Sequence, residues 1–99
     1  MKKELKLFKT LSIHMITEKE LDEIESRVNL AQPGPWKAFI EGRDHESGSS
    51  FIMTGENETN RGEDIELLGA TNEDYEFIAN ARQDIPKLLR EIRELKGNK

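Results

Sequence analysis

The stretch TNEDYEFIANARQDIPKLLREIRELKG, residues 71–97, is the strongest secondary-structure signal in the chain. Its opening, Thr71-Asn72-Glu73-Asp74, places a hydroxyl side chain just before an apolar pattern, which is typical of a helix N-cap. The apolar residues that follow recur at helical spacing until Gly97: Tyr75, Ile78, Ala81, Ile85, Leu88, Leu89, Ile92 and Leu95. The segment is therefore predicted to be helical, with one apolar stripe packed on a core.

Pro86 interrupts this helical pattern. A proline inside a helix removes a backbone donor and crowds the preceding turn. Either one helix kinks at Pro86, or a second helix begins near Asp84 with Pro86 in its first turn, where proline is tolerated. We favour two helical segments.

A second, shorter helix is predicted to begin at Thr17. Thr17-Glu18-Lys19-Glu20 has the capping-box pattern, in which Thr17 and Glu20 satisfy each other's backbone amides. The apolar residues after it share one helical face: Leu21, Ile24, Val28 and Ala31. The helix is expected to end by Gln32, because Pro33-Gly34-Pro35 forbids its continuation.

The middle of the chain is predicted to form three strands. Residues 36–41 alternate between Trp36, Ala38 and Ile40 on one side and Lys37, Phe39 and Glu41 on the other, which suggests a strand that ends at Gly42. Two short apolar runs, 51–54 and 65–68, flank a turn-rich segment at 55–64. The expected fold is therefore α+β, a small antiparallel sheet with an N-terminal amphipathic helix and a C-terminal kinked or split helix packed on one face.

The N-terminal residues 3–16 also alternate between apolar and polar side chains. Leu11, Ile13 and Met15 are separated by polar residues, which favours a further strand. A helix through Leu5, Phe8 and Leu11 fits the pattern less well.

Composition excludes several classes of protein. A length of 99 residues predicts one domain. The absence of cysteine excludes disulfides, thiolate zinc sites and cysteine nucleophiles, and it fits a reducing compartment. The sequence contains no run of about 20 apolar residues, the length needed to span a bilayer. Lys6 and Lys9 interrupt any apolar stretch long enough for a secretory signal, so we expect a cytoplasmic protein. The net charge of −5 disfavours general nucleic-acid binding.

The residues that usually carry chemistry are scattered along the sequence. His14 and His45 have no other ligand at metal-binding spacing, and the acids between Glu56 and Asp64 lack a calcium-loop frame. No nucleophile motif or glycine-rich phosphate loop is present. We therefore expect neither an enzyme nor a bound metal or cofactor.

Three residues are candidates for partner binding: Trp36, Arg82 and Asp84. Trp36 is predicted to be largely buried, the alternative being an exposed binding residue. Helical phase places Arg82 within the apolar arc, while Gln83 faces away. Arg82 either bonds to a carboxylate or to carbonyls of a neighbouring strand, or forms an anion or partner site with Asp84 at the proline bend.

The stripe from Ile78 to Leu95 also matches the spacing of a coiled coil. Because Pro86 lies within it, packing inside the chain is the favoured interpretation. A homodimer formed through this helix is the alternative, since so small a core would gain from a second subunit.

Two motifs resemble a known group of proteins. Residues 31–36, AQPGPW, follow the first helix, and residues 72–89, NEDYEFIANARQDIPKLL, open the last. Together they resemble a family of short uncharacterised bacterial and phage-borne proteins, over roughly Ile16 to Leu95. The resemblance implies a single domain at 15–97, with residues 1–14 an extra strand or a dispensable extension. It also implies a prophage or mobile-element accessory protein of the cytoplasm, with no activity to carry over.

The resulting hypothesis is a non-enzymatic protein that binds a host or phage protein partner. The alternative is a protein weakly associated with nucleic acid through cations near the C-terminus: Lys87, Arg90, Arg93, Lys96 and Lys99. Glu91 and Glu94 interleave with these cations, which favours a solvated mixed face instead.

Overall fold

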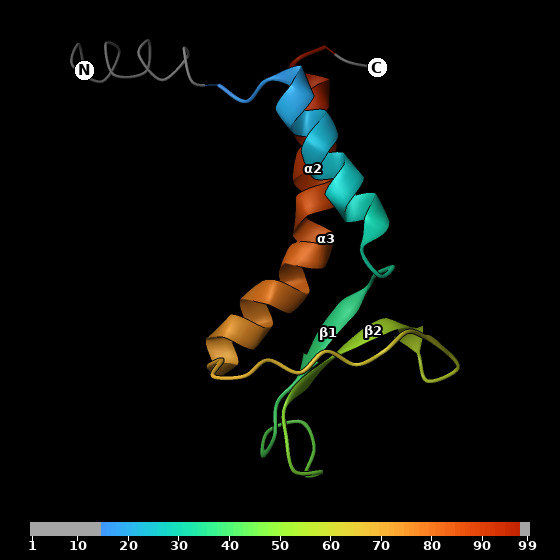
Figure 1. Ribbon diagram of the computed structural model, residues 1–99, viewed down its shortest axis with the longest axis vertical. Coiled ribbons are helices and arrows are strands. Elements are labelled where there is room, and N and C mark those ends of the chain that lie inside the picture. The colour runs from blue at the N-terminus through green and yellow to red at the C-terminus, as the bar shows by residue number, and fades with distance from the viewer. Residues whose placement is uncertain (1–14, 98–99) are drawn as a thin grey trace, which may run out of the picture.

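The computed structural model describes residues 15–97 as two helices and a three-stranded antiparallel sheet (Figure 1). The elements in chain order are α2 (Glu18–Leu30), β1 (Trp36–Phe39), β2 (Phe51–Asn57), β3 (Asn60–Arg61) and α3 (Asn72–Leu95). This confirms the predicted α+β class. The strand expected at residues 3–16 falls almost wholly outside the described residues, and Met15 and Ile16 belong to no helix or strand.

Helix α2 begins and ends where its sequence predicts. The Glu20 amide donates to the Thr17 hydroxyl at 3.0 Å, and the Thr17 amide donates to the Glu20 carboxylate at 2.8 Å, so the capping box is complete. The helix ends at Leu30, ahead of the proline-rich turn. Its apolar face buries Leu21 fully.

Helix α3 is one continuous helix of 24 residues, so the favoured interpretation of two segments is wrong. It too opens with a capping box, formed by Thr71 and Asp74. Pro86 lies in its interior, and Figure 1 shows the helix axis bending along its length. Ala79 is buried before Pro86 and Leu89 is buried after it. Packing therefore holds the backbone helical on both sides of the missing hydrogen bond.

The sheet has the order β1-β2-β3, with Trp36 opposite Thr54 and Phe39 opposite Phe51. The alternation predicted for residues 36–41 is confirmed, since Ala38 and Ile40 are buried while Lys37 is exposed. The core beneath α3 consists of Ala38, Ile40, Ile52, Tyr75 and Ala79.

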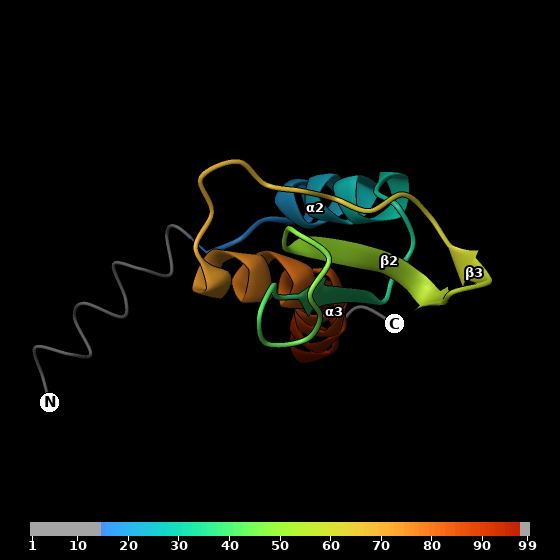
Figure 2. The ribbon, with the colours of Figure 1, turned by 90° about the horizontal axis from the view of Figure 1, so that it is seen from below.

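The third strand differs from the predicted one. It lies at Asn60–Arg61, within the segment expected to be a loop, and residues 65–68 contribute only a single bridge from Ile65 to Ile52. Figure 2 shows this segment running alongside β2. β3 was missed because it is two residues long and has no buried apolar face to mark it.

The two helices have different neighbours. α3 packs on β1 and β2, as predicted for the C-terminal helix, whereas α2 packs on α3 alone among the described elements. The helices run in opposite directions, so that Arg93 near the end of α3 reaches Glu18 at the start of α2. We call this pair of helices, α2 with the C-terminal half of α3, the helical arm. Within residues 15–97, neither helix combines the length and apolar composition needed to cross a bilayer.

Candidate binding groove

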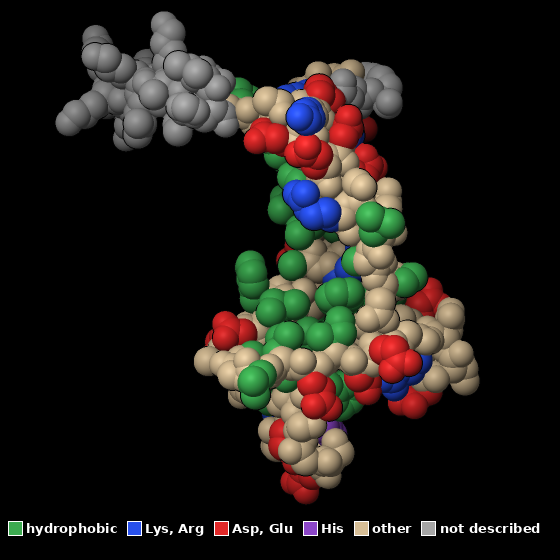
Figure 3. Space-filling model, viewed as in Figure 1, with side chains coloured by type: hydrophobic (Ala, Val, Ile, Leu, Met, Phe, Trp, Pro, Cys, Tyr) green, Lys and Arg blue, Asp and Glu red, His purple; other side chains and the backbone are tan. Residues whose placement is uncertain are grey.

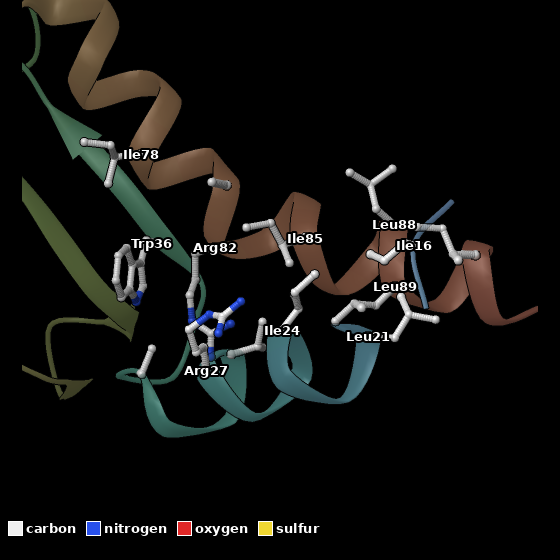
Figure 4. A pocket seen from close by; sticks show the side chains of 14 residues that line it. Ile16, Leu21, Ile24, Arg27, Trp36, Ile78, Arg82, Ile85, Leu88 and Leu89 are labelled. Carbon is white, nitrogen blue, oxygen red and sulfur yellow. The ribbon is translucent and has the colours of Figure 1, made fainter. Parts of the chain in front are cut away.

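An apolar groove of about 530 Å³ lies between α2 and α3 (Figure 4). Its volume is within the range of protein ligand sites. All but two of the residues that line it are apolar. The lining consists of Ile16, Leu21, Ile24, Arg27, Val28, Ala31, Trp36, Ile78, Ala81, Arg82, Ile85, Leu88, Leu89 and Ile92.

The groove exists because two helices cannot enclose a core. The apolar stripe of α2 faces that of α3, but only Leu21 and Leu89 become buried in the arm. Ile85 keeps 38% of its surface exposed and Leu88 keeps 59%. In Figure 3 hydrophobic side chains gather on this face where the arm meets the sheet. The described part of the chain leaves this apolar surface uncovered.

Trp36 lies at the sheet end of the groove. Its indole N–H donates to the carbonyls of Gln32 and Pro33, each at 3.2 Å. Trp36 is partly buried, because it packs against the core cluster on one side and lines the open groove on the other. Trp36 therefore combines features of both interpretations made from the sequence.

Arg82 enters the groove from α3 and is partly buried. Its Nε donates to the carbonyl of Gln32 at 2.9 Å, and its guanidinium carbon lies 6.0 Å from the centre of the Trp36 ring. The expected bond to a carbonyl is present, but the carbonyl follows α2 and is not part of a strand. The Nη1 and Nη2 atoms of this guanidinium make no hydrogen bond to the described residues, so their N–H groups can donate to a ligand.

A second guanidinium, that of Arg27, belongs to the same groove. It comes from the last turn of α2, and Figure 4 shows it approaching the part of the groove that Arg82 enters. Neither arginine has a carboxylate partner among residues 15–97. Sequence reasoning missed Arg27, although its position three residues after Ile24 and one before Val28 places it at the edge of the apolar stripe.

Gln83 is a further residue that the sequence did not reveal. It was expected to face away, yet its Oε1 accepts from the Trp36 amide at 2.7 Å and its Nε2 donates to the Trp36 carbonyl at 3.2 Å. The expectation was wrong because α3 lies against β1, so more than the apolar arc of the helix is covered there. Gln83 thus fixes the backbone of Trp36 at the groove.

Gln32 fixes the other side of the same junction. Its side-chain oxygen accepts from the Thr54 hydroxyl at 3.2 Å and from the Glu63 amide at 3.0 Å. The residue after α2 is thereby anchored to β2, while its backbone carbonyl receives Arg82 and Trp36. The position of the two groove residues follows from these bonds.

Asp84 is exposed and does not line the groove. Its carboxylate forms no hydrogen bond or ion pair with the described residues, and the continuous helix directs it away from Arg82. The two side chains proposed from the sequence as one site at a bend are therefore not brought together within one chain.

The far end of the arm is held by charged groups. Arg93 lies 3.0 Å from both Asp22 and Glu25 and 3.4 Å from Glu18. The carboxylates of Asp22 and Glu25 raise the pKa of Arg93 above its usual value. The Lys96 amine donates to the Ile16 carbonyl at 2.9 Å. These polar contacts join the end of α3 to the beginning of α2 and to the residue before Thr17.

The second polar cluster lies in the loop after β1, away from the groove. Asp44 accepts from the Ile40 amide at 2.8 Å and pairs with Arg43 at 2.7 Å. The bond from Arg43, with that from Ile40, lowers the pKa of Asp44 to about 2. His45 stands edge-on to Phe39 and Phe51. Within the described residues no three side chains are grouped to hold a metal ion, and His14 lies outside them.

Comparisons with protein-family models, curated proteins and solved structures find no match to this chain.

Proposed function

We propose that this protein is a non-enzymatic binding protein of the cytoplasm, an accessory protein of a prophage or mobile element, and that its partner is a protein. The observation that supports the proposal is the groove of the helical arm, an apolar surface held open by polar anchors at both ends. Uncovered apolar patches of this kind favour protein contacts.

The groove favours a partner segment of defined chemistry. Two helices with an apolar channel between them accept the apolar face of a third helix, as in other helix-in-groove complexes. Arg27 and Arg82 add two guanidinium forks without acidic partners in residues 15–97, and such forks bind carboxylates in two-point geometry. The best-fitting partner is an amphipathic helix that carries a carboxylate beside its apolar stripe.

The alternative, weak association with nucleic acid, has less support. Of its four proposed cations that are described, Arg93 is bonded to carboxylates and Lys96 to a carbonyl. Lys87 and Arg90 remain on a chain of net charge −5. We expect no electrophoretic shift of single-stranded or duplex DNA at low salt. A shift that disappears with added salt would favour the alternative.

Photocrosslinking in the native host tests the proposal. Ile85 lines the groove and is accessible, so p-benzoylphenylalanine placed there should form a protein adduct. The same group at Leu68, which is fully exposed outside the groove, is the control and should not form that adduct. The adduct should be lost when Arg27→Glu is added. Absence of any adduct from position 85 would contradict the proposal.

Arginine variants separate binding from folding. The guanidinium of Arg27 makes no bond with the described residues, so Arg27→Met should fold as well as the wild type and form less adduct. Arg82→Met also loses the bond to Gln32, so it should be destabilised as well as weakened in binding. Full adduct formation by both variants would show that neither guanidinium contacts the partner.

A further inference from the structure

The outer face of α3 carries a line of exposed large apolar side chains. Phe77, Leu88 and Leu95 keep 75%, 59% and 81% of their surface exposed. At 100° per residue, their spacings of 11 and 7 residues place all three within about 20° of one another around the helix. Leu88 also lines the groove, so the line meets the groove at this residue.

Unpaired charges of opposite sign flank this surface. Asp84 and Glu91, seven residues apart on α3, are exposed, and their carboxylates have no hydrogen bond or ion pair with the described residues. Across the groove, Arg27 of α2 also lacks a partner there. One chain therefore displays, on a single face, an apolar helix edged with carboxylates and a groove that offers a cation.

We infer that the helix seated in the groove is α3 of a second copy of this chain, in a two-fold symmetric dimer. The inference rests on the proposed function, since it names the protein segment that the groove binds. In such a dimer each contact occurs twice, so one surface must carry both halves of every pair. Asp84 of each copy then faces Arg27 of the partner subunit.

The second copy meets every requirement of the groove with features already described. Its α3 supplies the apolar stripe and a carboxylate one residue before Ile85. Two arms together form four helices, an arrangement that commonly encloses an apolar core. Leu88 and Ile85, half exposed in one chain, would become interior residues of that bundle.

The mass of the full-length chain in solution is the first test. Light scattering coupled to size exclusion should give twice the chain mass of 11.4 kDa. Leu88→Glu should reduce the mass to that of one chain, and Leu68→Glu, the matched control outside the groove, should leave the dimer intact. Circular dichroism establishes that both variants fold. A wild-type chain that is monomeric at the highest soluble concentration overturns the inference.

A charge exchange tests the orientation. Arg27→Glu and Asp84→Arg should each raise the dissociation constant of the dimer at least tenfold, because each places like charges together twice. An equimolar mixture of the two variants should recover the dimer, since both cross-subunit pairs become opposite in charge again. Variants that dimerise as tightly as the wild type, or a mixture no tighter than its components, overturn the inference.

The photocrosslink separates this inference from the proposed function. An adduct from position 85 with the mass of two chains supports both. An adduct with a different protein, from a chain that is monomeric by light scattering, overturns the inference and leaves the proposed function standing. No adduct, together with a dimer that Leu88→Glu does not affect, overturns both.

Discussion

The two ends of α3 are packed in contrasting ways. Its N-terminal half lies on the sheet, where Tyr75 and Ala79 complete a closed core with Ala38, Ile40 and Ile52. Polar groups there are also satisfied, because the Tyr75 hydroxyl accepts from the Leu67 amide at 2.9 Å and donates to the Ser50 carbonyl at 3.1 Å. Its C-terminal half lies against α2, where only Leu21 and Leu89 are buried.

The difference shows that one stripe of apolar residues serves two purposes along a single helix. At the sheet end β1 and β2 cover the apolar stripe of α3, so Tyr75 and Ala79 are buried. In the arm only α2 is available, so most of the stripe stays at the surface and charged residues hold the helices together. A small chain that leaves this much apolar surface uncovered gains stability when a partner covers it.

The largest effect on stability is expected from a substitution in the closed core at the sheet end of α3. Ile52 is fully buried between the sheet and α3. Ile52→Ala leaves a cavity and should lower the free energy of unfolding by about 2 to 5 kcal/mol. Leu30→Ala, at a site that is 84% exposed, is the control and should change it by about 0.5 kcal/mol or less. Denaturant titration measures both, and equal effects would mean that the assigned core is wrong.

The next effect concerns the junction between the two ends. Gln83→Ala leaves the amide and the carbonyl of Trp36 without their hydrogen-bond partner. This change should lower the free energy of unfolding by about 1 to 3 kcal/mol. Asn80→Ala removes only exposed bonds to Glu76 within the same helix, so a small change is expected. The sole tryptophan reports the junction directly, and its emission maximum should move to longer wavelength in Gln83→Ala. Unchanged stability and emission would show that solvent replaces the glutamine.

A smaller effect is expected in the arm. Amide hydrogen exchange should be slower in β2 than in α2, because α2 is covered on one side only. Arg93→Ala removes the pairs to three carboxylates of α2 and should speed exchange in α2 while leaving β2 unchanged. High salt should have the same direction of effect in the wild type. Faster exchange throughout the molecule would show that the two ends unfold as one unit.

The smallest effect is a pH dependence at the edge of the sheet end. The folded state holds the pKa of Asp44 at about 2, below the ordinary 3.8, so the carboxylate form favours folding. This contribution is complete above about pH 4 and is lost as the pH falls through about 2. The stability difference between the wild type and Asp44→Asn should therefore be constant near neutrality and shrink below about pH 4. A difference that persists at about pH 2 would refute this assignment.

Local signals in the sequence predicted the fold well, and contacts across the fold were harder to predict. Thr17 and Thr71 mark both helix starts because each cap is completed within four residues. The buried alternation of Ala38 and Ile40 likewise marks β1. Asn60–Arg61 gave no such signal, since a short exposed strand needs no apolar face. Pro86 was misjudged because packing on both sides, which overrides its preference, is not visible locally.

The groove was only partly predictable. Arg82 was found because a cation within an apolar arc is unusual on any helix. Gln83 and Arg27 were missed, because their roles depend on where β1 and α3 come to lie relative to them. The separation of Arg82 and Asp84 likewise follows from the unbroken helix, which the sequence alone left open.

The side chain of Gln83 has a consequence for how the molecule can assemble. β1 is an outer strand, and outer strands invite the addition of another chain's strand. Here the amide of Gln83 imitates a neighbouring peptide group at Trp36, and the carboxylate of Asp44 occupies the amide of Ile40 further along the same edge. Between these two blocked positions, Trp36 and Ile40, only the backbone of Ala38 remains. The β1 edge of the sheet is thereby protected against the addition of another strand.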